Sequence, residues 1–347
     1  MREMLKSKIN IIESSISSNS SPYVIAEVGS NHDQDLIKAK ELIDVAVEAK
    51  AGAVKFQLFR ADALYPNHDG LYDIFKSLEL NAGWVPELSE YARRRGIHFL
   101  ASAFDEDSVD VLELVGVPAH KIASSEATNW PLIHKMAVTK KPLIISTGMC
   151  DVIDIEEAIN VARGAANEEI ILMQCGAVYP LENKSANIKV IQTLYQRFSC
   201  PVGFSDHTLG NTAAVVAIGA GATVFEKHFT LDKKADGPDH FYALEPAELE
   251  NYISSLGQAY ESLGSEDKQL LTSERELGRR EGLYFTRDME VGEIIMEPDL
   301  VSSRPALGIR DRYTKAVVGA SLLEVVKKGQ SVSWSHIGRL DPKTSFE

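Results

Sequence analysis

The feature that most constrains the fold is a series of eight short apolar segments, each followed by a turn and a helix-like pattern. The segments span residues 23–29, 53–59, 97–104, 120–126, 141–147, 169–175, 200–207 and 222–229. Between them, stretches such as 35–52 and 154–167 are predicted helices, and Gly52 is the predicted stop of the first. Eight alternating β and α units favour a closed parallel (β/α)₈ barrel over a doubly wound sheet.

The composition changes after residue 262, which we interpret as a domain boundary. Residues 263–282 are charged and contain no apolar strand pattern, so they predict a linker. Residues 283–340 alternate short strand-like runs with glycine turns, which predicts a small β-rich second domain. Residues 1–20 are predicted to be an N-terminal tail, which leaves 21–262 for the barrel.

Charge and composition argue against several classes of partner. The 347 residues carry a formal net charge of -14, so the chain lacks the basic surface that binds nucleic acid or an anionic membrane. The N-terminus has no signal-peptide core, and no apolar run approaches membrane-spanning length. Three cysteines without CxxC spacing fit a reducing compartment. We therefore expect a cytoplasmic protein with neither nucleic-acid nor membrane partners.

The C-terminal strand ends of a parallel barrel gather around one mouth, so polar residues at those ends are candidates for a functional site. The candidates are Glu27, Lys55, Gln57, Ser102, Lys121, Ser124, Glu126, Tyr179, Ser205, His207, Glu226 and His228. Lys55 interrupts an apolar strand and is expected to point into the barrel or its mouth. Lys121 is out of phase with Ser124 and Glu126, so these three share a pocket only if the strand bends. An equally weighted alternative is that Lys121 does not face the pocket and instead extends to solvent from the end of its strand.

His207 and His228 follow neighbouring strands and are the strongest candidates for metal ligands. With Asp206 and Glu226 nearby, two imidazoles make an open site in which a divalent ion can act as a Lewis acid. Lysines beside such a site would attract an anion that carries phosphate or carboxylate.

The motifs "IAEVGSNH", "AVKFQ", "KIASSE", "ISTGM", "GFSDHT", "EKHFTLD", "GPDH" and "RPALG" follow one another in order. Over about residues 22–340 the chain resembles the N-acetylneuraminate (sialic acid) synthases, including pseudaminic and legionaminic acid synthases. The resemblance implies a TIM barrel followed by an antifreeze-like SAF domain. It also implies an enzyme that condenses phosphoenolpyruvate with an N-acetylated hexosamine, releases phosphate and yields a nine-carbon 2-keto sugar acid. The acceptor would be N-acetylmannosamine or a 2,4-diacetamido-trideoxyhexose.

The resemblance also implies roles for single residues. His207 and His228 would hold a divalent metal, usually Mn²⁺, with Mg²⁺ or Co²⁺ as alternatives. The phosphoenolpyruvate pocket would comprise Lys55, Ser102, Lys121, Ser124 and Ser205, with Glu126 also in contact with substrate. The sugar and the attacking water would be held by Glu27, Gln57, Tyr179, Glu226 and Asp239, and either Glu27 or Glu226 would handle the water. Arg304 of a partner subunit would bind the sugar's acyl group, which implies a domain-exchanged homodimer.

Three departures from the family pattern bear on substrate identity. "CGAVYP" has Gly176 and Ala177 where the family carries hydroxyl or amide side chains, "LENKSANI" lacks a second proline, and Gln34 replaces a common glycine. Two rival functions remain. Lys55 or Lys121 could form a Schiff base in an aldolase on the same barrel, or the chain could be a non-catalytic sugar-binding homologue.

Overall fold

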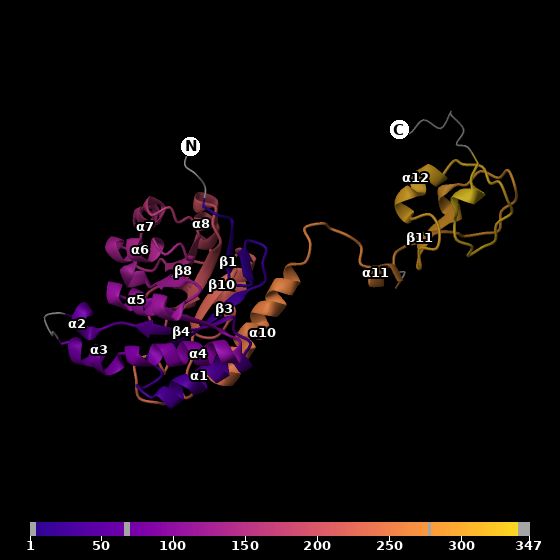
Figure 1. The fold of residues 1–347 in the computed structure, drawn as a ribbon. Coiled ribbons are helices and arrows are strands. Elements are labelled where there is room, and N and C mark those ends of the chain that lie inside the picture. Colours follow the sequence, from indigo (N-terminus) through magenta and orange to yellow (C-terminus); the bar gives the residue numbers. More distant parts are fainter. Residues whose placement is uncertain (1–4, 66–69, 277–278, 339–347) are drawn as a thin grey trace. The chain divides into compact units, whose positions relative to one another are not determined.

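The computed structural model describes residues 5–65, 70–276 and 279–338. It divides into two compact units, Met1–Gly264 and Ser265–Glu347. Within the first unit, strands form a central ring that is covered on its outside by helices (Figure 1).

The first unit is a closed barrel of eight parallel strands in the order β10-β3-β4-β5-β6-β7-β8-β9, which confirms the predicted architecture. The strands are β3 (Tyr23–Gly29), β4 (Ala53–Leu58), β5 (His98–Ala103), β6 (His120–Ile122), β7 (Leu143–Ser146), β8 (Ile170–Cys175), β9 (Val202–Asp206) and β10 (Val224–His228). The helices that follow them in turn are α1 (Leu36–Glu48), α4 (Val85–Arg95), α5 (Glu106–Val115), α6 (Trp130–Ala137), α7 (Val152–Gly164), α8 (Val190–Phe198), α9 (Thr212–Gly219) and α10 (Pro246–Leu263).

Two predicted element boundaries are corrected by the structure. Helix α1 begins after Asp35, whose side chain accepts hydrogen bonds from two backbone amides of the first turn, but its last residue is Glu48, so the helix stops well short of the predicted stop at Gly52. The chain leaves the helix where Lys50 adopts a left-handed conformation with φ of 65°. The predicted strand 120–126 ends at Ile122, and Ser124–Glu126 form a 3₁₀ turn.

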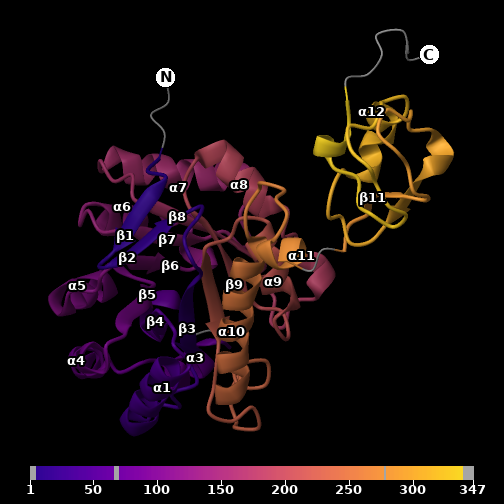
Figure 2. The ribbon, with the colours of Figure 1, turned by 90° about the vertical axis from the view of Figure 1, so that its right-hand side faces the viewer.

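The segment predicted as a tail contains a hairpin of β1 (Lys8–Ile11) and β2 (Ser14–Ser17). The side chains of Ile9, Ile11 and Ile16 are buried among inward-facing residues from the first halves of the barrel strands. Figure 2 shows the hairpin lying over the barrel strands. An apolar floor therefore fills the N-terminal half of the barrel, which is the half opposite the mouth.

An insert separates β4 from α4 at the mouth end of the barrel. It contains α2 (Ala61–Leu64), α3 (Tyr72–Leu78) and a 3₁₀ turn, Ala82–Trp84. The insert also contains the motif "NHDGLYDIF", which lies partly outside the described residues.

The second unit contains a short helix α11 (Thr272–Glu276), the antiparallel pair β11 (Gly282–Phe285) and β12 (Leu300–Ser303), and a helix α12 (Thr314–Val317). Its small apolar core includes Leu283, Phe285, Ile295, Val317 and Val332. Across the described parts of both units, no helix combines the length and apolarity needed to cross a membrane.

Candidate active site

The barrel interior changes from apolar to polar towards the mouth, by which we mean the C-terminal strand ends. Alternate residues of a strand face the same side, so the inward positions above the apolar floor are set by strand register. They are occupied by polar side chains from several strands, all of them buried: Glu27, Lys55, Ser102, Lys121, Ser146, Ser205, Glu226 and His228. The structure therefore brings the predicted strand-end residues of the barrel together at one end.

Lys55 is at the centre of a buried hydrogen-bonded group. Its Nζ lies 2.6 Å from Glu27 Oε2 and 3.6 Å from Glu226 Oε1, and donates to Ser102 Oγ at 2.9 Å. Gln57 Nε2 donates to the other Glu27 oxygen at 2.8 Å. Burial disfavours the Lys55 ammonium, but the carboxylates of Glu226 and Glu27 outweigh it and raise the pKa of Lys55. Lys55 therefore stays protonated.

Lys121 has weaker partners. Its Nζ donates to Ser146 Oγ at 2.8 Å and to the Ile122 carbonyl at 3.1 Å, and lies 3.8 Å from Glu226 Oε1. Burial lowers the pKa of Lys121, since the carboxylate of Glu226 compensates only in part. The alternative in which Lys121 reaches solvent is excluded, because its exposed fraction is 2%. An incoming anion would complete the coordination of this ammonium.

The rings of His207 and His228 face the same mouth, with centroids 5.8 Å apart. His207 Nδ1 lies 2.8 Å from the Gly176 carbonyl, so Nδ1 carries the proton and the lone pair of Nε2 remains for another ligand. His228 Nδ1 is buried without a hydrogen-bond partner among the described residues. The Tyr179 ring lies 4.0 Å from the His207 ring.

These two imidazoles fit an open metal site with few protein ligands. The described residues contain no group of three or more His, Cys, Asp and Glu side chains that could hold a metal ion. A divalent ion bound by His207 and His228 would therefore keep several positions for water or substrate oxygens.

Asp239 approaches His228 from the loop after β10. The backbone amide and hydroxyl of Ser30 donate to Asp239 Oδ2 at 3.0 and 2.8 Å, and the Tyr242 hydroxyl donates to Oδ1 at 2.6 Å. A Cβ on Gly29 would lie 2.6 Å from the same carboxylate, so only glycine fits there. We did not predict roles for Ser30, which lies within the motif "IAEVGSNH", or for Tyr242, which follows the motif "GPDH" by two residues.

Ser124 and Glu126 reach the mouth from the 3₁₀ turn after β6. This turn resolves their predicted phase conflict with Lys121, because the strand has ended before them. Ser124 Oγ accepts from the Gly148 amide at 3.0 Å, and Ser125 Oγ donates to Glu126 Oε2 at 2.6 Å. Burial raises the pKa of Glu126 to about 7, although Ser125 and Lys121 oppose the shift.

The elevated pKa of Glu126 predicts a pH-dependent stability. Because the folded pKa of about 7 exceeds the ordinary 4.5, this stabilising contribution is complete below about pH 4.5 and is lost as the pH rises through 7. Glu126→Gln stays neutral, so the wild type should lose about 2.5 kcal/mol relative to the variant between pH 5 and pH 8. Urea unfolding of both proteins at the two pH values measures this, and parallel pH profiles would refute the assignment.

At the departure from the family pattern, Gly176 has a structural role. A Cβ on Gly176 would lie 2.7 Å from the Leu181 side chain, and the Gly176 carbonyl orients His207. Packing against Leu181 therefore favours glycine at position 176. Neither Gly176 nor Ala177 offers a polar side chain to a ligand.

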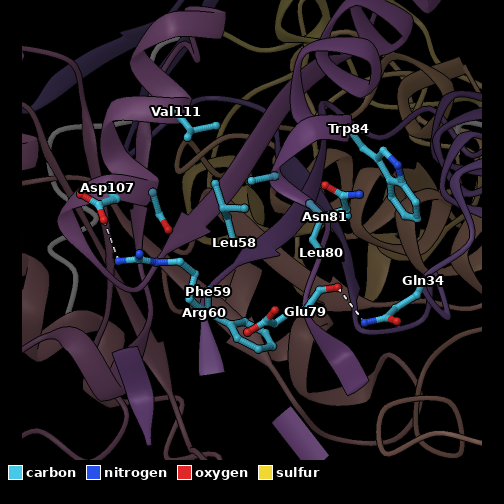
Figure 3. A pocket seen from close by; sticks show the side chains of 12 residues that line it. Gln34, Leu58, Phe59, Arg60, Glu79, Leu80, Asn81, Trp84, Asp107 and Val111 are labelled. Atoms are coloured by element: carbon cyan, nitrogen blue, oxygen red, sulfur yellow. Dashed lines mark hydrogen bonds and ion pairs between the residues drawn. The ribbon is translucent and has the colours of Figure 1, made fainter. Parts of the chain in front are cut away.

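A separate pocket of about 440 Å³ lies between the β4–α4 insert and α5 (Figure 3). Its apolar lining is Leu58, Phe59, Leu80, Trp84 and Val111, and Arg60 pairs with Asp107 at its rim. None of the predicted site residues lines it, as far as the described residues go. Gln34 also lines this pocket, and its Nε2 donates to the carbonyls of Lys76 and Glu79 at 3.3 and 3.2 Å.

Gln34 therefore fastens the insert to the β3–α1 loop, despite a left-handed φ of 53°. We expect Gln34→Ala to keep that strained backbone but lose both hydrogen bonds, so that backbone amides in 72–78 exchange about tenfold faster. Hydrogen–deuterium exchange of the wild type and the variant tests this, with α6 as the internal reference. Unchanged exchange in α3 would show that other contacts fix the insert.

Arg304 belongs to the second unit. Its side chain is 65% exposed, and its Nε lies 3.5 Å from Glu281 Oε1. The site described above is therefore built from the barrel unit alone.

The NeuB family matches residues 42–268, which is most of the barrel. The chain belongs to the NeuB family. It is 39% identical over 336 residues to the N,N'-diacetyllegionaminic acid synthase of Legionella pneumophila, covering 91% of this chain and 94% of that one. It is 34% identical over 300 residues to the human N-acetylneuraminate-9-phosphate synthase, covering 78% and 83% of the two chains.

A solved structure agrees with this membership. The N-acetylneuraminic acid (sialic acid) synthetase of Leptospira borgpetersenii, in complex with citrate, superposes with a TM-score of 0.74 at 30% identity. The match covers 80% of this NeuB-family chain and 96% of that protein.

Proposed function

We propose that this NeuB-family chain is an enzyme that condenses phosphoenolpyruvate with an N-acetylated hexosamine. The products are phosphate and a nine-carbon 2-keto sugar acid. The observation that carries the proposal is the convergence of two buried ammonium groups and two imidazoles at one mouth. Lys55 and Lys121 approach the same oxygen of Glu226, and His228 is two residues further along the same strand.

Phosphoenolpyruvate would enter above the lysines. Lys55 is already neutralised by Glu27. In the part of the chain that the structure describes, Lys121 has no carboxylate at hydrogen-bond distance, so it is the better binding group for an anion. The hydroxyls of Ser102, Ser124 and Ser205 would add neutral donors around the same ligand.

His207 and His228 would hold a divalent ion, for which Mn²⁺ is our first choice. When bound, such an ion polarises the acceptor's aldehyde oxygen so that the enol carbon can attack it. The Gly176 carbonyl orients the His207 ring. Asp239 lies beside His228 and would accept hydrogen bonds from sugar hydroxyls.

After the enol carbon has attacked the aldehyde, C2 of the former phosphoenolpyruvate is cationic and is captured by water before phosphate leaves. A carboxylate must orient that water. Glu27 Oε1 accepts a hydrogen bond from Gln57, and Glu27 Oε2 lies 2.6 Å from Lys55 Nζ in an ion pair, although this contact lacks hydrogen-bond geometry. Glu226 Oε2 is buried and makes no hydrogen bond within the described residues, which favours Glu226 for this role.

The acceptor is inferred from the relatives. The 39% identical Legionella protein is an N,N'-diacetyllegionaminic acid synthase, which favours a 2,4-diacetamido-trideoxyhexose over N-acetylmannosamine. The three free cysteines fit synthesis in the cytoplasm.

Phosphate release from phosphoenolpyruvate tests the proposal, with Mn²⁺ present and then removed by EDTA. The acceptor panel contains a 2,4-diacetamido-trideoxyhexose, N-acetylmannosamine and unacetylated mannose. We expect turnover with the first sugar that EDTA abolishes and Mn²⁺ restores. No phosphate release with any acetylated sugar would refute the proposal, and borohydride trapping of a lysine adduct would favour the aldolase instead.

We further propose that the second unit is the SAF module and that the enzyme works as a domain-exchanged homodimer. Exposed apolar side chains on the loops and helix starts that follow β7–β10 support a covering partner. They are Met149, Ile153, Val178, Leu209 and Phe241. Light scattering should report a dimer.

Arg304 of the partner subunit would then contact the sugar's acyl group. Arg304→Ala should raise the KM for the acceptor about tenfold and change the KM for phosphoenolpyruvate less than about twofold. Steady-state kinetics measure both constants, with the exposed Arg312→Ala as control. Equal loss of both affinities would contradict this role.

A further inference from the structure

An ion pair lies outside the barrel wall, in the mostly apolar layer between the strands and the helices. Asp206 on β9 and Lys227 on β10 face this layer because their neighbours Ser205, Glu226 and His228 face the barrel interior. The exposed fractions of Asp206 and Lys227 are 1% and 2%. The two residues lie directly opposite each other in the strand register.

Hydrogen bonds engage both oxygens of Asp206 and give the Lys227 ammonium two acceptors. Lys227 Nζ lies 3.0 Å from Asp206 Oδ2 and also donates to the Thr208 carbonyl. The Thr208 amide and hydroxyl donate to Asp206 Oδ1 at 2.8 and 2.7 Å. From α10, the Tyr252 hydroxyl donates to Asp206 Oδ2 at 3.2 Å, and the Tyr252 ring lies 5.5 Å from Lys227 Nζ.

Residues of this network are direct chain neighbours of both histidines. Asp206 and Thr208 flank His207 on both sides, and Lys227 immediately precedes His228. A well-packed apolar pair is often as stable as a buried ion pair, so stability alone does not require charges here. Charges with a single satisfied geometry do, however, fix how two neighbouring strand ends sit against each other.

We propose that the Asp206–Lys227 pair is a positioning device that sets the separation and orientation of the His207 and His228 rings for a divalent cation. The inference rests on the proposed function, since it assumes that these two rings bind the metal. Asp206 and Lys227 themselves touch neither metal nor substrate; they act through the backbone of their neighbours.

The test compares metal affinity with stability. Asp206→Leu combined with Lys227→Met removes both charges at similar volume, so neither remains unpaired. We expect the melting temperature to fall by several degrees, because the Thr208 amide and hydroxyl and the Tyr252 hydroxyl lose their acceptor, while the Kd for Mn²⁺, measured from the paramagnetic resonance of free Mn²⁺, rises 10- to 100-fold. The control His120→Leu removes a buried polar contact with Glu113 in the same layer, on β6, which is far from β9 and β10 in the strand order of the barrel. It should leave the Kd unchanged.

If the double variant does not fold, Tyr252→Phe removes a single hydroxyl from the network and should raise the Kd about threefold. An unchanged Kd in a folded double variant, or an equal rise in the His120 control, would overturn the positioning role. Wild-type protein that binds no Mn²⁺ would refute the two-histidine site itself and this inference with it. Mn²⁺ binding without turnover would leave the inference standing and count against the proposed reaction only.

Discussion

His207→Ala is expected to reduce metal-dependent turnover about 1,000-fold while the protein stays folded. The substitution removes one of the two imidazoles proposed to bind the cation, and a Lewis acid contributes several kcal/mol to such a reaction. The lost hydrogen bond to the Gly176 carbonyl costs about 1 kcal/mol, which lowers the melting temperature by only a few degrees.

Phosphate release as a function of Mn²⁺ concentration, together with a thermal melt, measures both effects. His134→Ala on the exposed surface of α6 is the matched control and should behave as the wild type. Turnover that keeps its Mn²⁺ dependence in His207→Ala would remove this residue from the metal site.

Lys121→Met is expected to raise the KM for phosphoenolpyruvate about 100-fold, with less than a threefold change in the KM for the acceptor. Among the described residues, Lys121 donates hydrogen bonds only to Ser146 Oγ and the Ile122 carbonyl, and Glu226 lies 3.8 Å away, so its ammonium is available to an anion. A charge-assisted bond of about 3 kcal/mol accounts for the factor of 100. The fold should tolerate the change because Glu226 keeps Lys55 at 3.6 Å.

Steady-state kinetics with each substrate varied in turn give both constants for Lys121→Met. Lys135→Met on α6, which removes a partly exposed lysine, is the control. If the acceptor's KM rises instead, Lys121 holds the sugar and the orientation of the two substrates must be reversed.

Much of this arrangement could be predicted from the sequence because it follows from strand periodicity. Residues two apart in a strand share a face, so the sequence predicts that Glu226 and His228 point the same way, as do Lys55 and Gln57. Once the eight strands are placed in a barrel, their C-terminal ends must converge. The prediction therefore needed only the strand count and the phase of each strand.

The rest depends on contacts between distant parts of the chain. Ser30 and Asp239 are 209 positions apart, and nothing local to either residue indicates that they bond. The strand at Lys121 ends early although "HKIASSE" contains no helix or strand breaker. The hairpin over residues 8–17 was missed because its short serine-rich strands become stable only by packing under the barrel.

Within the described residues, that hairpin closes the base of the barrel, which leaves the mouth as the route to the buried polar groups. Substrates, hydrolytic water, phosphate and the finished sugar acid must all pass the same rim, since the base is sealed by isoleucine side chains. The order in which molecules arrive and depart is thus imposed by the architecture: whatever occupies the outermost position has to leave before anything deeper can be exchanged.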